Sequence, residues 1–465
     1  MGIKSFFGLN SQDSDKKEVR NKFNEAFFKL IGGMYTAYDD NGETYVEKGY
    51  NINPTVFSVI SQQAKKTSAV PYYIKKVKDE SSRKQLVRLK SATKYNMSTS
   101  QSVKQAILES KAYEDKGDKD FPLDRPNPLQ TWEEIHEMYK TFMKLNGNFY
   151  MYMVTRSHPK NMGQPLEVYV LPSQYTQIVL KDNISLEPNS DPISHYMLTM
   201  GDQFVEFPSE NIIHIKYPNP NYGNSGEHLY GQAPLRAALR NLQADDLALD
   251  MNIKTLKSGG AYGLIHGKGV TLQEGQAAAV KDKLLEMEAS SENLAKIAAV
   301  SQEMGFTRIG LTTDEMKPFE YLKFNEKEIC NVLGWKDKLL NNDEGSNFGE
   351  YLKTLRKQVI TDDIMPDLNL LASALNDKFL PRFSGYENCE QVYDPSELPE
   401  MQSDMGELTT WLDRALKSGV ITRNEYRIAL RYMEHEDANM DVITVAEGTM
   451  SLEDALENPF NSIDG

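Results

Sequence analysis

The chain has 465 residues with a formal net charge of −15 at pH 7, and 40% of its residues are hydrophobic. This length predicts about two to four domains with ample core. The acidic balance argues against a protein that grips nucleic acid through a broadly basic surface. Since no apolar run approaches the roughly 18 residues of a membrane span, we expect no membrane partner. The two cysteines, Cys330 and Cys389, give no disulfide framework and indicate a reducing compartment.

The first half of the chain alternates helix-like and strand-like patterns. One helical face of residues 54–68 is apolar, through Val56, Val59, Ile60 and Ala64. Thr131 followed by Glu134 forms a capping box and predicts a helix over residues 131–145. The other segments predict a surface helix at 15–30, a turn at 38–42, an exposed hairpin or loop at 79–94, and strands at 70–75, 149–154, 167–171 and 175–180. This mixture predicts an α+β fold for about the first 230 residues.

A strand at residues 211–216, a loop rich in Pro, Asn and Gly, and a long helix come next. Pro234 suits a first helical turn and Gly259 suits a C-terminal cap, so we predict a helix over residues 233–258. Such a rod is about 38 Å long, whereas a mean helix has about 11–12 residues. Its apolar stripe consists of Leu235, Leu239, Leu242, Leu249, Ile253 and Leu256. Two interpretations stay open: a core helix of one large domain, or a rod that packs against copies of itself.

Beyond the long helix the pattern is again mixed. A second helix is predicted at residues 319–333, followed by a polar, irregular segment that ends at Gly349. A third helical region at 350–379 should bend at Pro366. The remaining segments predict a helix at 271–287, strands at 262–265, 297–300 and 306–309, a linker at 393–405, and short helices at 406–418 and 423–432.

No constellation of catalytic residues emerges from the sequence. His136 lies beside Glu137, but Lys140 stands where a zinc-protease helix needs its second histidine, so we interpret His136 as a surface residue. His214, in an apolar strand, is predicted to be a packed core histidine. Cys330, on an apolar helix face, is predicted to be buried rather than reactive. We therefore expect a protein that is not an enzyme, without cofactor or bound metal.

Two pairs of adjacent aspartates support a competing hypothesis, a metal-dependent DNA-processing enzyme. The pairs are Asp245 with Asp246 and Asp362 with Asp363. Two-metal sites use carboxylates of this kind. Adjacent residues on a helix point about 100° apart, however, so neither pair converges on one ion by itself.

The order of the motifs resembles the portal (head–tail connector) proteins of tailed bacteriophages, in particular the siphovirus-type portal family. The resemblance covers residues 53–432. At two places the chain departs from the family pattern, with Ala233 for the usual Ser and Trp335-Lys336 for Val-Pro. The matching runs are Asn53 to Ile60, Val70-Pro71, Arg125 to Pro128, Leu145 to Tyr150, Leu229 to Leu235, Glu328 to Gly334, and Thr422 to Arg427.

The resemblance implies an α+β portal fold with a wing, a long-helix stem, a small α/β clip and a helical crown. Its segments, carried over by matching position, are residues 1–231 for the N-terminal part of the wing, 232–258 for the first stem helix, 259–313 for the clip, 314–334 for the second stem helix, 335–349 for the tunnel loop, 350–395 for the wing helix and its return, and 396–465 for the C-terminal crown.

The implied function is a structural ring at one vertex of a phage capsid, a conduit for genome packaging and ejection. The ring would be a homo-oligomer, by family analogy a dodecamer, around non-specific double-stranded DNA. Implied partners are the major capsid and scaffold proteins, the terminase large subunit, and later a head–tail adaptor protein. The protein would be assembled in the host cytoplasm and located in the virion. A tail or baseplate adaptor is a further alternative.

Candidate site residues follow from these segments. Lys and Asn side chains can touch phosphates without reading sequence. The tunnel-loop candidates for DNA contact are Lys336, Lys338, Asn341, Asn342, Asn347 and Phe348. The candidates for the subunit interface are the residues of the apolar stripe: Leu235, Leu239, Leu242, Leu249, Ile253 and Leu256. A strongly acidic ring elsewhere would repel phosphate and let DNA slide.

Overall fold

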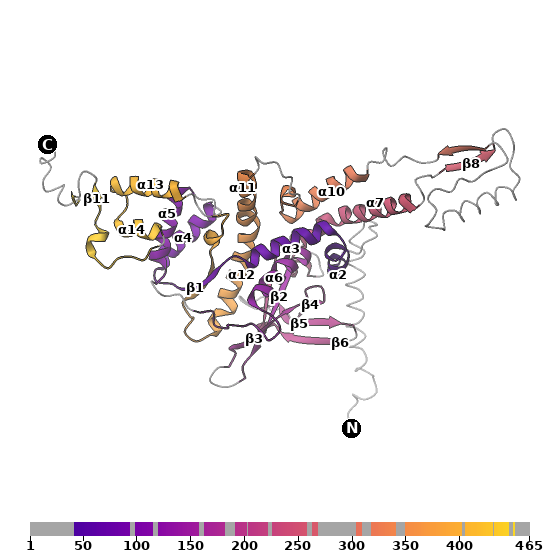
Figure 1. Ribbon diagram of the computed structural model, residues 1–465. Helices are drawn as coiled ribbons and strands as arrows, with labels where there is room; N and C mark the ends of the chain where they lie inside the picture. Colours follow the sequence, from indigo (N-terminus) through magenta and orange to yellow (C-terminus); the bar gives the residue numbers. More distant parts are fainter. Residues whose placement is uncertain are drawn as a thin grey trace, which may run out of the picture.

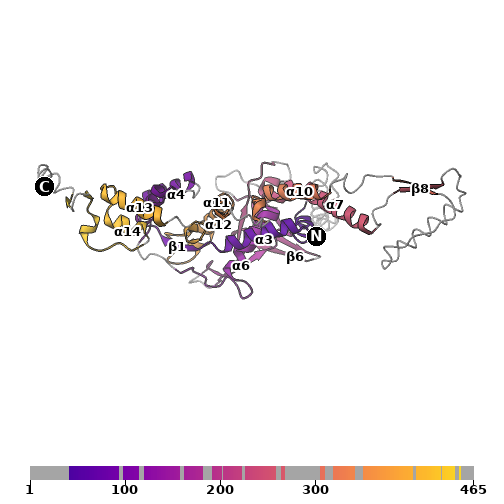
Figure 2. The same cartoon turned by 45° about the horizontal axis from the view of Figure 1, so that its top comes forward.

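The structure is a computed structural model that describes residues 41–93, 98–114, 120–157, 162–181, 191–201, 203–221, 226–257, 263–267, 304–308, 318–340, 349–401, 405–430, 432–445 and 450–451. The predicted helices at 15–30 and 271–287 and the predicted strand at 297–300 lie outside these ranges. The chain is elongated in two views (Figures 1 and 2), with helices α13 and α14 toward one end and strand β8 at the other.

The N-terminal described region begins with the short helix α2 (Gly42–Thr44), a π-helical turn (Tyr45–Tyr50) and helix α3 (Pro54–Ser68). Asn53 caps α3, because its side-chain oxygen accepts hydrogen bonds from the Thr55 and Val56 amides at 3.0 and 3.1 Å. The predicted apolar face is buried, with Val56, Val59 and Ile60 fully covered. The helix prediction for this segment is therefore confirmed to the residue.

Helix α6 (Trp132–Asn146) begins with the predicted capping box, formed by Thr131 and Glu134. It ends at Gly147, whose φ of 69° lies in the left-handed region that favours glycine. The strands that follow form two antiparallel three-stranded sheets, in the orders β3-β2-β7 and β4-β5-β6. Their bounds are β2 (Asn148–Thr155), β3 (Pro165–Leu171), β4 (Thr176–Leu180), β5 (Ile193–Met200), β6 (Gln203–Pro208) and β7 (Ile212–Lys216).

The two long helices form the second half of the core. A 3-10 turn (Pro234–Ala238) leads directly into α7 (Leu239–Lys257), close to the predicted bounds, and α10 (Pro318–Leu333) packs along it. Strands β8 (Gly263–Gly267) and β9 (Met304–Arg308) form an antiparallel pair beyond the end of α7 (Figure 1).

The helical region predicted at 350–379 is interrupted by a wider turn. Helix α11 (Gly349–Val359) passes through a π-helical turn (Ile360–Ile364) into α12 (Met365–Lys378). The turn ends just before Pro366, which has no amide hydrogen and collides with the carbonyl four residues back. One extra residue in the turn accommodates that conflict.

The prediction of an exposed hairpin or loop at 79–94 is wrong. Helix α4 (Glu80–Thr93) occupies this segment and pairs with α5 (Thr99–Ala112). Its Lys, Arg and Gln residues are good helix formers, and Leu86 is only 1% exposed because it packs against Leu108. Helices α13 (Met405–Lys417) and α14 (Arg423–Ala429) pack on α5 through Val103, Leu412, Ala415 and Ile421.

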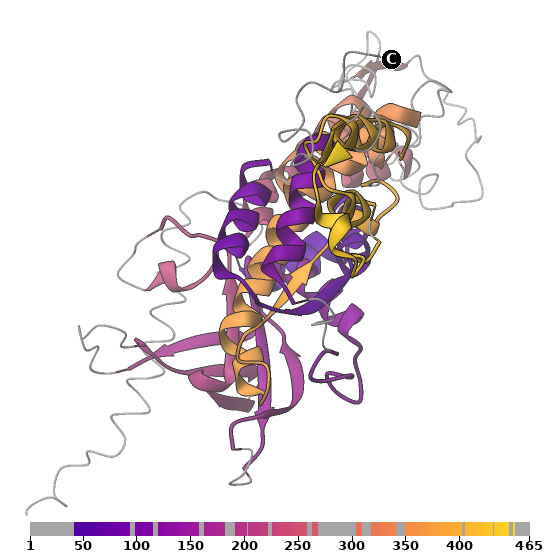
Figure 3. The same cartoon turned by 90° about the vertical axis from the view of Figure 1, so that its left-hand side faces the viewer.

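Strand β1 (Tyr72–Lys76) pairs with β10 (Cys389–Tyr393) and joins these helices to the body. A short pair, β11 (Thr444–Val445) and β12 (Met450–Ser451), lies near the C-terminus. The largest hydrophobic core gathers buried side chains of α3, α6, β2, β7, α10 and α12. Seen from the end that carries α13 and α14 (Figure 3), the strands of the two sheets lie to one side of most of the helices. Within the described residues, none of the helices combines the length and apolar character needed to cross a bilayer.

Candidate functional site at the start of the loop 335–349

The start of the long-helix region is fixed where two backbone segments cross. The Gly231 amide donates to Asn148 Oδ1 at 2.6 Å, and the Tyr217 amide donates to the Gly147 carbonyl at 2.9 Å. A Cβ added to Gly231 would lie 1.9 Å from the Gly147 oxygen. Only glycine fits this crossing, which lies three residues before Pro234 and so sets where the helical rod begins.

Farther along, a buried carboxylate ties α7 to α3 and α10. Asp245 accepts hydrogen bonds from Asn53 Nδ2 at 3.1 Å and from Asn325 Nδ2 at 2.8 Å. Asn241 Nδ2 donates to Asn325 Oδ1 at 3.1 Å. Burial raises the pKa of Asp245, while the two amide donors oppose that rise. The three elements are therefore held in one register by polar contacts inside the core.

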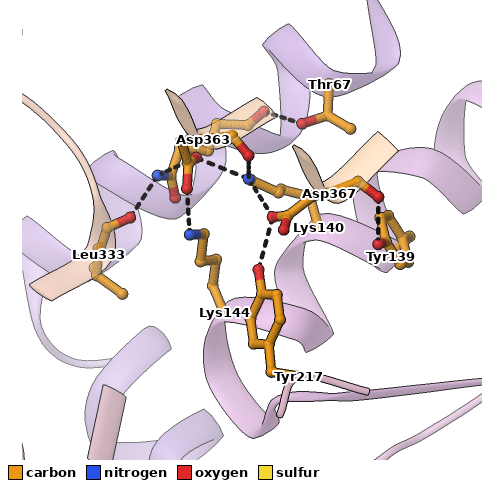
Figure 4. A network of polar contacts seen from close by, with 9 residues as sticks. Thr67, Tyr139, Lys140, Lys144, Tyr217, Leu333, Asp363 and Asp367 are labelled. Atoms are coloured by element: carbon orange, nitrogen blue, oxygen red, sulfur yellow. Dashed lines mark hydrogen bonds and ion pairs between the residues drawn. The ribbon is translucent and has the colours of Figure 1, made fainter. Parts of the chain in front are cut away.

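At the far end of α10 lies a cluster of four buried charges, here called the ion cluster: Lys140, Lys144, Asp363 and Asp367 (Figure 4). Lys140 Nζ lies 2.8 Å from Asp363 Oδ2 and 2.6 Å from Asp367 Oδ2. Lys144 Nζ pairs with Asp363 Oδ1. Tyr217 donates its hydroxyl to Asp367 Oδ2 at 2.7 Å. Two ammonium groups thus face two carboxylates, and the cluster is neutral.

The ion cluster reaches the loop through Gln63 on α3. Its Nε2 donates to Asp363 Oδ2 at 2.9 Å and to the Leu333 carbonyl, the last residue of α10, at 2.8 Å. Gly334 follows with a φ of 78°, and a Cβ added there would lie 3.0 Å from Asp363 Oδ1. Residues 333–335, here called the loop root, therefore meet the carboxylate of Asp363 at Gly334 and are linked to it through Gln63 at Leu333.

The charges shift one another's pKa values in directions that match the geometry. Burial opposes ionisation of Asp363, but the ammonium groups of Lys140 and Lys144 outweigh it and lower the pKa of the carboxyl. Burial likewise opposes the charge on Lys140, yet Asp363 and Asp367 together raise its pKa. The pKa of Lys144 is lowered by burial and by the neighbouring Lys140.

The structure describes only part of the predicted DNA-contact set. Lys336 and Lys338 are exposed: Lys336 immediately precedes a 3-10 turn (Asp337–Leu339) and Lys338 lies within it, with its Nζ 5.4 Å from the centre of the Tyr351 ring. Trp335, just before them, is buried at 2% exposure. The other four candidates lie outside the described residues: Asn341, Asn342, Asn347 and Phe348.

The predicted interface stripe divides into two parts. Leu235, Leu239 and Leu242 are buried in the main core of this chain, with at most 6% exposure, so they have little surface left for a neighbouring copy. Leu249 and Ile253 are 43% and 49% exposed. The side chain of Leu256 lies outside the described residues. The interface prediction therefore rests on the outer half of α7.

The aspartates of the competing enzyme hypothesis face different neighbours. Asp245 is bound by two asparagine amides and Asp363 by two lysines, while Asp362 is exposed. Among the residues that the structure describes, no three His, Cys, Asp or Glu side chains gather as a metal site. The carboxylates of Asp245 and Asp363 are thus engaged in structural contacts.

The interpretation of His136 as a surface residue is wrong. It is 3% exposed and lies between Trp132 O and the Tyr393 hydroxyl, each 2.6 Å from a ring nitrogen. Burial lowers its pKa, so the neutral ring donates from Nδ1 and accepts from Tyr393 at Nε2. The buried face of α6 thus includes His136, together with Lys140 and Lys144 further along the helix.

Two other expectations are confirmed. His214 stacks on Tyr150 with ring centres 4.4 Å apart, and burial lowers its pKa to about 3. Cys330 is fully buried, and burial raises the pKa of its thiol to about 12.

Sequence reasoning did not find the ion cluster. A signal was nevertheless present, because Lys140 and Lys144 are four residues apart on α6, and Asp363 and Asp367 are four residues apart across the π-helical turn. Two residues of the same charge that are four positions apart lie on one face of a helix. Which two faces meet is decided by the tertiary fold.

Comparison with known proteins agrees with this architecture. A family model described as phage portal protein matches residues 113–430, well over half of the chain. An uncharacterized protein of Rickettsia bellii (strain RML369-C) is 23% identical over 261 residues, which is 55% of this chain and 64% of the relative's length. The chain therefore spans less than two thirds of that relative.

Two solved structures of gene transfer agent (GTA) particles share the fold. A chain in the neck of an empty particle, computed with C6 symmetry, is 20% identical with a TM-score of 0.53, covering 85% of this chain and 94% of that one. A chain in the neck of a native particle, computed with C12 symmetry, is 19% identical with a TM-score of 0.53, covering 87% and 98%. With the family match over residues 113–430, the chain belongs to the phage portal protein family.

Proposed function

We propose that this chain forms a ring at one vertex of a phage capsid and acts as a conduit for double-stranded DNA. The ring has no catalysis of its own. A separate terminase motor docks on it during genome packaging, and a head–tail adaptor replaces the motor before ejection. The observation that carries the proposal is the family match over residues 113–430, which includes both long helices and the loop between α10 and α11.

The outer half of α7 supports a ring of identical copies. Leu249 and Ile253 lie exposed on a helix whose first half is buried in the core. Contiguous exposed apolar surface marks sites of protein interaction. In a closed ring, neighbouring copies cover this face. The similar chains come from GTA particle necks computed with C6 and C12 symmetry, which supports a ring, and a dodecamer is our working model.

End-on electron micrographs of the purified protein, together with native mass measurement, test the ring. We expect a closed annulus of about a dozen copies. A protein that stays monomeric at high concentration, both alone and with its capsid and scaffold proteins, contradicts the proposal. Images of whole particles separate a portal from a tail or baseplate adaptor, because a portal ring lies inside the capsid vertex and an adaptor ring lies outside it.

The loop provides the DNA contact in this proposal. Lys336 and Lys338 are exposed beside a buried loop root, so their charges are presented by a fixed base. Replacing both with Glu should impair packaging or retention of DNA while leaving rings intact, because each loses attraction to phosphate and adds repulsion. Lys84 on α4 is also exposed, and Lys84→Glu is the matched control. Unchanged packaging in the double variant would show that these lysines do not contact DNA.

A further inference from the structure

Three contacts hold the loop root: two come from α3 and from the π-helical turn, and the third comes from the end of α10 itself. Gln63 Nε2 binds the Leu333 carbonyl at 2.8 Å, the Asp363 carboxylate faces Gly334, and the Trp335 amide donates to the Cys330 carbonyl at 2.8 Å. The first of these is the link between the root and α3. It joins residues 270 positions apart in the sequence.

The other side of the loop leads to the same carboxylate. Helix α11 begins at Gly349, where the loop ends, and runs without a break into the π-helical turn that carries Asp363. Asp363 is also the residue that both lysines of α6 contact. A displacement of either end of the loop is therefore resisted at one point, which is anchored to α6 by two buried ion pairs.

Opposing contributions act on the buried position of Trp335. Its indole is 2% exposed, yet among the described residues Nε1 has no hydrogen-bond partner. A buried donor without an acceptor costs free energy that exposure to water would return. Apolar burial of the ring favours the observed position, and the unpaired N–H opposes it. The contacts of Gln63 with Leu333 and of Asp363 with Gly334 add to the interactions that favour the observed position of the root.

We propose that Gln63 and Asp363 are positioning residues that hold the loop root against α6 and so fix where Lys336 and Lys338 stand. This inference rests on the proposed function for its consequence in DNA packaging, but not for its structural content. In this proposal the ion cluster holds Asp363 in place and thereby resists displacement of the loop root relative to α6 and α3.

Gln63→Met tests the inference, because the two side chains have similar length and Met cannot donate the two hydrogen bonds. Asn325→Leu is the matched control, since it removes a buried amide donor from the same body but from Asp245 rather than from the root. Urea unfolding should show a similar decrease in the free energy of unfolding for both variants. Acrylamide quenching of Trp335 fluorescence reports how far the loop root is exposed to solvent. The Trp335 signal is obtained by subtracting the fluorescence of the same protein with Trp335→Phe.

We expect quenching of Trp335 to rise at least threefold in Gln63→Met and to stay unchanged in Asn325→Leu. In assembled particles, Gln63→Met should reduce packaged DNA at least tenfold relative to Asn325→Leu. In a protein that already carries the Glu substitutions at Lys336 and Lys338, Gln63→Met should reduce packaged DNA by a smaller factor than it does alone. The reason is that both changes act on the same DNA contact.

The outcomes separate the two proposals. If Trp335 is quenched equally in both variants, Gln63 does not position the root and the inference is overturned. If Trp335 responds and the lysine substitutions impair packaging, but Gln63→Met packages DNA as the control does, the position of the root does not govern the DNA contact and the inference is overturned. If the lysine substitutions alone leave packaging unchanged while Trp335 responds as expected, the DNA-contact part of the proposed function fails and the positioning of the root stands.

Discussion

Asp363→Asn is the most informative single change in this protein. The substitution keeps the shape of the side chain and removes one of the two negative charges in the ion cluster. Lys140 and Lys144, 0% and 6% exposed, then share the single carboxylate of Asp367. Breaking a buried ion pair from one side costs about 3–5 kcal/mol because a charge is left uncompensated. The free energy of unfolding of a folded protein is typically about 5–15 kcal/mol, so this loss is a large part of it.

The matched control lies one residue away. Asp362 is exposed, so Asp362→Asn should change stability by no more than about 0.5 kcal/mol. A compensating variant, Asp363→Asn with Lys144→Met, leaves one ammonium facing one carboxylate and should recover at least half of the loss. Urea unfolding followed by tryptophan fluorescence at a fixed protein concentration measures all three. An Asp363→Asn midpoint equal to that of the control would refute the reasoning.

The charge state of Asp363 also gives this prediction a pH dependence. Its pKa in the folded chain is lowered from 3.8, so its contribution is full above that value and is lost as pH falls through the folded pKa. The stability difference between wild type and Asp363→Asn should therefore be constant near neutral pH and should shrink only below about pH 4.

Four further outcomes are expected. Gly231→Ala should abolish folding of the region, because its Cβ would overlap the Gly147 oxygen, and soluble yield measures this. Asp245→Ala should cost about 2–4 kcal/mol in urea unfolding, since two buried amides lose their acceptor. Leu242→Asp should disrupt folding or ring assembly in micrographs by placing a charge in the core. Lowering the pH below 6.5 should destabilise the chain through His214, whose folded pKa is about 3, by up to roughly 4–5 kcal/mol.

Three of these outcomes have a control in the same chain. Gly201 has open space around its Cβ position, so Gly201→Ala should fold, with only the strain of a positive φ. Leu249→Asp should fold but weaken ring assembly, because Leu249 is 43% exposed. Asp246→Ala, if it abolished a metal-dependent DNA cleavage, would support the enzyme hypothesis instead. His214→Gln should flatten the pH dependence between 6.5 and 3, and an unchanged slope would contradict the assignment.

Local patterns along the chain determined most of the elements. Helix α3, the capping box of α6 and the rod that starts at Pro234 were all predictable, because caps, proline and apolar spacing act within a few residues. The π-helical turn lies just before Pro366, where proline predicted a disturbance of the helix. The segment of α4 was missed because its apolar residues are few and its many charges are equally typical of an exposed loop. Its helix is stabilised by Leu86 packing on α5, a contact that no local pattern contains.

Which side chains meet was decided by the tertiary structure alone. The sequence places Lys140 on one helix and Asp363 some 220 residues later, and nothing local requires a buried pair. The same holds for His136, which charge and spacing assigned to the surface and which the fold places against Tyr393. Burying a charge or a polar ring is favourable only where a partner is already held in place. That condition depends on how α3, α6, α10 and the π-helical turn pack together, so the loop root could be located in the sequence but not its anchor.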